Sequence, residues 1–268
     1  MALLDLSNLN LVLLDIEGEL LIAHFENTTV KKFNLSGMSF LDCSNNLLTD
    51  LPILPERIEE LYCSSNRLIS LPLLPKRLKW LDCSRNQLTN LPIFLPESLE
   101  FLHCEFNKLT ELPESLPEKL KVLGCAGNQL TKLPFLPEET KELYCSLNQL
   151  IALPILPKSL EILYCFGNQI TSLPLLPTGL QKLYCHTNQL ISLPSSFSKT
   201  LQEVSCHTNP LKYIPYLEQR PWYFRVPNIF FETHSKERYQ EGYRLQEINR
   251  HLFLTFFNEI GIQLDFLD

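Results

Sequence analysis

The chain has 268 residues, 45% of them hydrophobic, with a formal net charge of −7 and a pI of about 5.5. This hydrophobic fraction suffices for a continuous core. The acidic balance, without a basic run, argues against a surface that binds nucleic acid or anionic membrane. Because no uninterrupted apolar run is long enough to cross a bilayer, we expect no membrane span.

Residues 1–37 predict a cap for the structure that follows. Leu9 to Ile16 and Glu19 to Phe25 are apolar runs, and Gly18 between them can adopt the positive φ of a tight turn. We therefore predict an N-terminal β-hairpin. The segment carries acidic residues and no early lysine or arginine, unlike the charged start of a secretory signal, so we expect a reducing, cytoplasmic environment.

Residues 38–209 hold a ladder of nine cysteines, spaced 20 or 21 residues apart, and each is followed three positions later by asparagine. A fixed period near 20 residues is typical of stacked repeats, in which each unit contacts only its neighbours. We therefore predict a solenoid of about nine repeats. The cysteines are Cys43, Cys63, Cys83, Cys104, Cys125, Cys145, Cys165, Cys185 and Cys206.

The strand of each repeat is predicted by alternation around its cysteine. Leu61 and Cys63 are two positions apart and face the same way from a strand, whereas Tyr62 faces the other way. Asn66 ends the strand, and its amide can donate to and accept from backbone groups of its own repeat and the next. The leucine and cysteine are therefore predicted to be inward and the residue between them outward.

The return path of each repeat is set by proline. Pro72 and Pro75 fix φ and donate no hydrogen bond, so their segment is predicted to be extended or turn, not helix. Where the step is 21 residues, the extra residue usually falls between the prolines, as in Pro92 to Pro96 and Pro113 to Pro117. The return side is thus predicted to be the looser one.

The L-P-x-L-P return and the L-x-x-L-x-C-x-x-N-x-L frame resemble short-class leucine-rich repeats. The repeats of bacterial type III secretion effectors are the most similar, and related repeats occur in proteins of large DNA viruses. The resemblance implies an α/β-type repeat solenoid: an arc with a concave parallel β-sheet, an extended convex side, and protein partners bound by the concave surface. Some of those effectors add a ubiquitin-ligase domain with a catalytic cysteine. This chain has no cysteine outside the ladder, so we expect no enzyme.

The cysteines are interpreted as small inward core residues with reduced thiols. Their number is odd, and in-register parallel strands aim neighbouring side chains side by side. The spacing is C-x-x-N and not C-x-x-C, which disfavours zinc. We predict no cofactor. His186 and His207, at equivalent places on adjacent repeats, are the weak alternative as a metal pair or a pH sensor.

Residues 210–268 are predicted to form the C-terminal cap. An irregular aromatic stretch, Tyr213 to Phe231, precedes a helix predicted near 236–259, with Ser235 as N-cap and Gly261 as C′ residue. The apolar stripe of this helix is interpreted as packing on the last repeat. A docking helix for a partner is the alternative.

The candidate binding surface consists of outward residues beside the cysteines, in two aromatic groups. The first is Trp80, Phe101 and His103 with Phe106 as an additional candidate, and the second is Tyr144, Tyr164, Tyr184 and Phe166. Exposed, contiguous aromatic side chains are typical of interaction sites. The function predicted is a non-enzymatic scaffold that binds a protein partner through the concave face, as a pathogen or viral host-interaction factor in the host cytoplasm. The alternatives are a virion component or self-associating homo-oligomer, and an adaptor that recruits substrates to an enzyme. The candidate residues are Tyr62, Trp80, Phe101, His103, Tyr144, Tyr164, Phe166, Tyr184 and His186.

Overall fold

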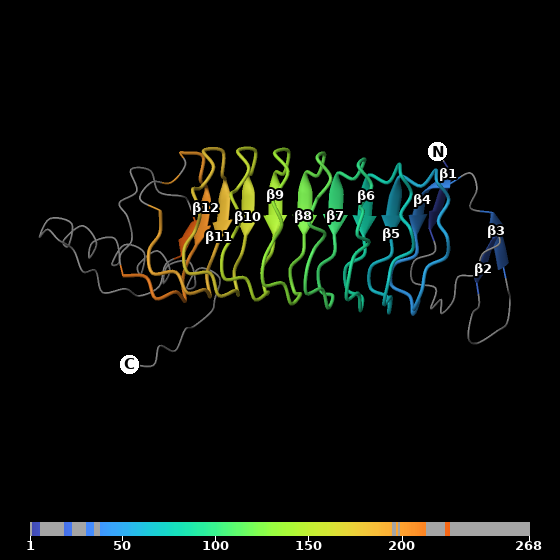
Figure 1. The fold of residues 1–268 in the computed structure, drawn as a ribbon, viewed down its shortest axis with the longest axis horizontal. Helices are drawn as coiled ribbons and strands as arrows, with labels where there is room; N and C mark the ends of the chain where they lie inside the picture. The colour runs from blue at the N-terminus through green and yellow to red at the C-terminus, as the bar shows by residue number, and fades with distance from the viewer. Residues whose placement is uncertain are drawn as a thin grey trace, which may run out of the picture.

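In a computed structural model, the repeats coil into a parallel β-solenoid whose strands stack along one long axis (Figure 1). The structure describes residues 2–5, 19–22, 31–34, 38–194, 197, 199–212 and 223–225. Nine strands, β4 to β12, form, one in each of the nine cysteine repeats, and eight coils connect them. They span Met38–Asp42, Glu60–Tyr62, Trp80–Asp82, Phe101–His103, Val122–Gly124, Glu142–Tyr144, Ile162–Tyr164, Lys182–Tyr184 and Glu203–Ser205.

These nine strands pair in parallel and in register, so equivalent residues of successive repeats form columns. Leu61 pairs with Leu81, for example, and Tyr62 pairs with Asp82. Parallel strands lie about 4.8 Å apart. A side chain on the sheet therefore has the equivalent side chains of the two adjacent repeats as its nearest neighbours.

The sheet has one further strand at each end. β1 (Ala2–Asp5) pairs in parallel with β4, and β13 (Tyr223–Arg225) pairs in parallel with β12. The stretch predicted to be irregular therefore contains a strand at Tyr223–Arg225. Neither end strand carries the leucine–x–cysteine frame, so the repeat pattern predicted neither of them.

A separate antiparallel pair joins β2 (Glu19–Ile22) to β3 (Lys31–Asn34). β2 lies within the predicted second arm of the N-terminal hairpin. Its partner in the described residues is β3, and the predicted first arm, Leu9 to Ile16, lies outside them. The C-terminal helix predicted near 236–259 also lies outside the described residues.

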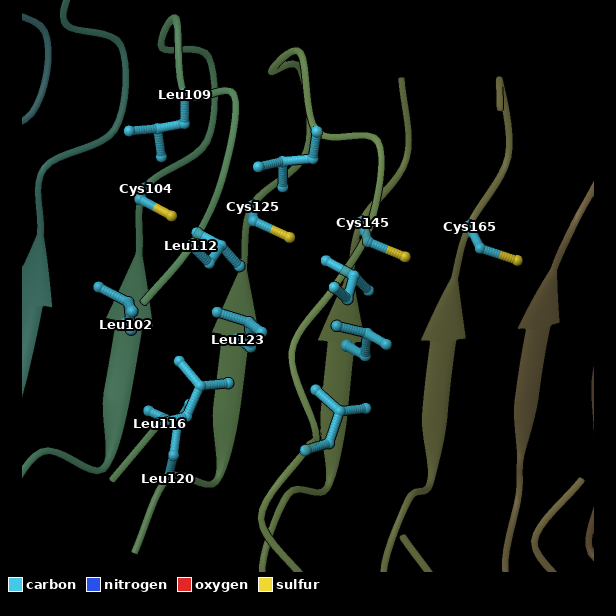
Figure 2. Packing of buried hydrophobic residues seen from close by; sticks show 14 of the residues in the cluster. Leu102, Cys104, Leu109, Leu112, Leu116, Leu120, Leu123, Cys125, Cys145 and Cys165 are labelled. Carbon is cyan, nitrogen blue, oxygen red and sulfur yellow. The ribbon is translucent and has the colours of Figure 1, made fainter. Parts of the chain in front are cut away.

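The core lies between the sheet and the return segments and is built from the same positions in every repeat (Figure 2). The inward cysteine and the leucine two positions before it are buried, as predicted, and leucines of the return segment pack against them. Burial raises the pKa of the thiols, that of Cys165 to about 12, and all nine cysteines are free. One complete rung consists of Leu102, Cys104, Leu109, Leu112, Leu116 and Leu120.

The asparagine ladder links each repeat to its predecessor, as predicted from its amide. Asn66 donates from Nδ2 to the carbonyl oxygens of Cys43 and Cys63, at 2.9 and 3.1 Å, and its Oδ1 accepts from the Leu48 N–H at 3.0 Å. The same bonds recur at Asn86, and so on along the solenoid. Backbone groups that would otherwise be buried and unpaired are thereby satisfied.

The residue directly before each ladder asparagine has a positive φ, between 53° and 66°. Glycine fills this position at Gly127 and Gly167, while bulkier residues such as Leu147 occupy it elsewhere. The left-handed conformation costs a non-glycine residue roughly 1–2 kcal/mol. The cysteine–asparagine turn therefore repeats a local strain that the asparagine hydrogen bonds offset.

Candidate functional site

The outer sheet face is the face of the sheet that points away from the core. Three columns form it: the residues three before, one before and one after each cysteine. In most strands the central leucine is buried while the residues on both sides of it are partly exposed. All nine candidate residues lie in these columns, as the alternation predicted.

The N-terminal ring cluster consists of Phe40, Tyr62, Trp80, Phe101 and His103. The Trp80 ring stacks on Phe101 with centroids 4.4 Å apart, and Tyr62 stacks on the other side of Trp80 at 5.9 Å. His103 lies 5.5 Å from Trp80, and Phe40 lies 5.3 Å from Tyr62. Tyr62 and Phe40 extend this cluster by two strands beyond the predicted first group, and Phe40 was not among the predicted candidates.

The tyrosine cluster consists of Tyr144, Tyr164 and Tyr184, on three consecutive strands. The Tyr164 ring lies 5.1 Å from Tyr144, edge to face, and 4.5 Å from Tyr184. Beside it, Phe166, His186 and His207 form a side stack with centroid spacings of 4.5 and 4.4 Å. The three tyrosines of the predicted second group are thus continuous in the structure, whereas Phe166 stacks on His186.

Strand β8 separates the two clusters because it carries small residues where its neighbours carry rings. Gly124 occupies the column of His103 and Tyr144, and the Glu105 side chain lies over it, so that a Cβ at this position would clash with the carboxylate. Val122 on the same strand is buried. The outer sheet face therefore presents two ring surfaces, and the Glu105 carboxylate lies over Gly124 between them.

Phe106 does not belong to the N-terminal ring cluster. It has a positive φ in the cysteine–asparagine turn, its ring packs under the Arg85 guanidinium at 4.7 Å, and it lies over Gly127. With Asp82, His103 and Glu105, Phe106 and Arg85 line a shallow hollow at the edge of the outer sheet face. The turn conformation rotates this side chain out of the columns, which alternation alone could not predict.

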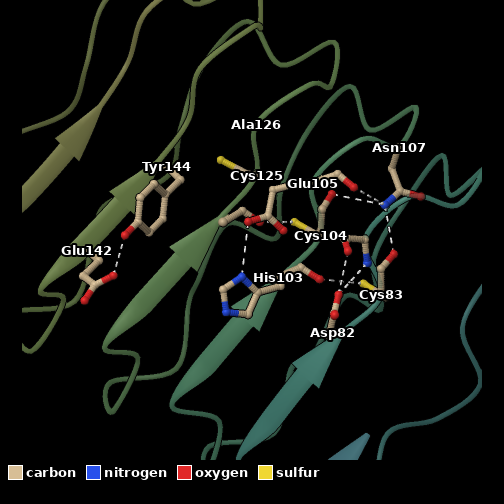
Figure 3. Close-up of polar contacts among 12 residues, drawn as sticks. Asp82, Cys83, His103, Cys104, Glu105, Asn107, Cys125, Ala126, Glu142 and Tyr144 are labelled. Atoms are coloured by element: carbon tan, nitrogen blue, oxygen red, sulfur yellow. Dashed lines mark hydrogen bonds and ion pairs between the residues drawn. The ribbon is translucent and has the colours of Figure 1, made fainter. Parts of the chain in front are cut away.

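Carboxylates fix the orientation of several rings (Figure 3). The Tyr144 hydroxyl donates to Glu142 Oε2 at 2.6 Å, and His103 Nδ1 lies 3.2 Å from Glu105 Oε1. The Tyr184 hydroxyl donates to Glu203 Oε2 at 2.6 Å, and this bond is the main reason that the pKa of Glu203 lies below its ordinary value. The clusters are therefore pre-organised surfaces.

The outer sheet face is acidic. Its three columns hold six carboxylates against one lysine, Lys182, which is paired with Glu203 at 2.9 Å. Burial, followed by the nearby Glu60 carboxylate, raises the pKa of Tyr62 to about 12. The six carboxylates are Asp42, Glu60, Asp82, Glu105, Glu142 and Glu203.

One polar group in the N-terminal ring cluster has no partner among the residues that the structure describes. The Trp80 indole Nε1 is buried and makes no hydrogen bond within the described residues. An unpaired buried N–H costs roughly 1–3 kcal/mol. The sequence did not predict this feature, because it depends on how the rings of three strands stack.

The described residues hold no group of three or more histidine, cysteine, aspartate or glutamate side chains placed to bind a metal ion. His186 and His207 stack face to face, and Nδ1 of each lies about 3 Å from the hydroxyl of the threonine that follows it, at 3.1 and 2.9 Å. Within the same ranges, no helix is both long and apolar enough to cross a membrane.

Neither a protein-family model nor a curated protein matches the sequence. Solved structures do. YopM from Yersinia enterocolitica is 33% identical, with 72% of this chain and 53% of that chain covered and a TM-score of 0.52. The functional domain of InlJ from Listeria monocytogenes, which includes a cysteine ladder, is 31% identical, with 69% and 44% covered and a TM-score of 0.64.

The chain thus spans about half the length of these two proteins. The leucine-rich-repeat protein FLRT2, in an octameric complex with Latrophilin 3 and Unc5D, is also similar: 21% identity, 63% of this chain, 67% of that chain and a TM-score of 0.50. At that identity the likeness concerns the fold alone. The structural neighbours are leucine-rich-repeat proteins, in agreement with the predicted solenoid.

Proposed function

We propose that the chain is a non-enzymatic scaffold of short-class, L-P-x-L-P leucine-rich repeats that binds a protein partner through its outer sheet face. The observation that carries this is the pair of ring surfaces, the N-terminal ring cluster and the tyrosine cluster. Both lie outside the core, and both are held by hydrogen bonds to carboxylates. Rigid, partly exposed tyrosine and tryptophan side chains are typical of binding hot spots.

The partner segment that fits this surface is cationic. Six carboxylates and one paired lysine leave a strong negative excess across the columns, and rings flank most of these carboxylates. Arginine guanidinium groups stack on aromatic faces and pair with carboxylates. Such a partner gains from both features, and its binding weakens as salt rises.

The proposed setting is the cytoplasm, with a host-interaction role like that of the effectors and viral proteins that the repeats resemble. The similarity to YopM and InlJ supports a protein-interaction scaffold in general. Nine buried thiols with raised pKa values are compatible with a reducing compartment. An adaptor that recruits substrates to a separate enzyme would use the same outer sheet face.

The test is a pull-down with the full chain and two variants. Tyr144→Ala/Tyr164→Ala/Tyr184→Ala removes the tyrosine cluster, and Trp80→Ala/Phe101→Ala removes the centre of the other. Ile151→Ser, at an exposed apolar side chain outside the columns, is the control. A partner retained by wild type and control but lost by either cluster variant supports the proposal. Equal retention by all four proteins contradicts it.

A further inference from the structure

A second apolar surface lies on the return side of the solenoid and is separate from the outer sheet face. The residue that follows the first proline of each return segment points away from the core, while the leucines around it point inward. Its exposed fraction is 79–90% wherever it is apolar. This return row consists of Ile53, Leu73, Ile93, Phe135, Ile155 and Leu175, together with Phe94, the residue next to Ile93.

The return row has no part in the core. Leu71 and Leu74, on either side of Leu73, already pack against the buried cluster. A polar residue at the position of Leu73 would serve the fold equally well, as Glu114 and Ser115 do at one rung. Exposed apolar side chains that recur at one position of six rungs are typical of interaction sites, because leaving them in water is unfavourable.

Charges beside the row distinguish its ends. The turn after the second proline carries Lys76 and Arg77 at the Leu73 rung, and Glu138 and Glu139 at the Phe135 rung, three repeats away. All four side chains are exposed. Among the described residues, no ion pair within 4.0 Å involves any of them. A basic and an acidic turn thus flank the same apolar row.

We propose that the return row binds a second copy of this chain, in a two-fold dimer whose solenoids run in opposite directions. A two-fold contact brings the same patch of both copies together. With the Leu73 rung of one copy opposite the Phe135 rung of the other, Lys76 and Arg77 face Glu138 and Glu139, and this happens twice. Ile53 then lies opposite Ile155, and the polar rung at Glu114 lies opposite the rung that carries both Ile93 and Phe94.

The charges disfavour one of the two neighbouring registers. A shift of one rung that places the Glu114 rung of each copy opposite itself brings Lys76 and Arg77 against Lys158, and Glu97 against Glu138. Like charges in contact disfavour that arrangement. In this dimer the apolar row supplies most of the affinity, and the exposed charge pairs set the register.

The test is sedimentation equilibrium of the full chain at low salt. Wild type is expected to form a dimer, and Leu73→Ser/Phe135→Ser to weaken it at least about tenfold. Lys76→Glu/Arg77→Glu and Glu138→Lys/Glu139→Lys are each expected to weaken it several-fold. The combination of all four charge reversals restores the wild-type affinity, because each pair is re-formed with its signs exchanged. Circular dichroism checks that the variants are folded.

Ile151→Ser is the matched apolar control and leaves the dimer intact. A wild type that stays monomeric, or a dimer that survives Leu73→Ser/Phe135→Ser, overturns the proposal. Failure of the four reversals to restore affinity rejects the register. A dimer lost in Tyr144→Ala/Tyr164→Ala/Tyr184→Ala places the contact on the outer sheet face and also overturns it.

Discussion

Replacing Asn128 by alanine tests whether the asparagine ladder holds the repeats together. Asn128 donates to the carbonyl oxygens of Cys104 and Cys125, at 3.0 and 3.1 Å, and accepts from the Leu109 N–H at 3.0 Å. All of these groups are buried. Alanine leaves the Leu109 N–H without its acceptor, at roughly 1–3 kcal/mol. The Cys104 and Cys125 carbonyls each keep one donor, the Asn107 and Asn148 amides, at 3.1 and 3.0 Å. With one unpaired N–H and two carbonyls that lose one of their donors, we expect a loss of about 2–4 kcal/mol in the free energy of unfolding.

The assay is urea unfolding followed by circular dichroism, for wild type, Asn128→Ala and the control Gln129→Ala. Gln129 is the exposed neighbour of Asn128, so its truncation is expected to change the free energy of unfolding by less than about 0.5 kcal/mol. An Asn128→Ala loss below about 1 kcal/mol would refute the reasoning, because it would mean that water or neighbouring groups replace the amide at no cost.

Three further predictions concern the asparagine ladder, two glycines and the buried cysteines. Asn148→Asp places a carboxylate oxygen against the Cys145 carbonyl, which raises the folded-state pKa of the new carboxyl group. Relative to wild type, the free energy of unfolding of this variant should therefore fall as pH rises above about 4, as urea midpoints measured across pH would show. Gly167→Ala should cost about 1–2 kcal/mol by the same assay, because φ is +66° and Leu147 lies over the site, whereas Gly179→Ala, with open surroundings, should cost less. The buried thiols, such as Cys165 with a pKa raised to about 12, should resist alkylation until the chain unfolds, as mass spectrometry would show. Since their folded-state pKa values are raised, the free energy of unfolding should also decline as pH rises above about 8.5.

The strands, the inward cysteines and the asparagine bonds follow from the sequence because each is a local consequence of a strict period. Leu61, Cys63 and Asn66 stand at fixed offsets, and a two-residue alternation is enough to assign their directions. The structure places them accordingly. The two ring surfaces are likewise predictable as columns, because register in a parallel stack carries one repeat onto the next.

Features that depend on turn geometry or side-chain stacking could not be predicted from the repeat pattern. The positive φ before each asparagine was signalled by Gly127 and Gly167, but the bulkier residues at the same position conceal it. The return row follows from the inward direction of the leucines around Leu73, which the proline spacing does not specify. The end strand Tyr223–Arg225 shares no motif with the repeats, yet it pairs in parallel with β12.

The direction of the asparagine bonds has a consequence for the order in which the solenoid is completed. The Leu48 N–H of one repeat donates to Asn66 of the following repeat, which also gives the Cys43 carbonyl a second donor beside Asn46. Each coil is thus finished by residues made later, so a chain emerging from the ribosome carries one incomplete coil at its growing end. Synthesis and assembly proceed in the same direction, and every newly made asparagine closes the coil before it.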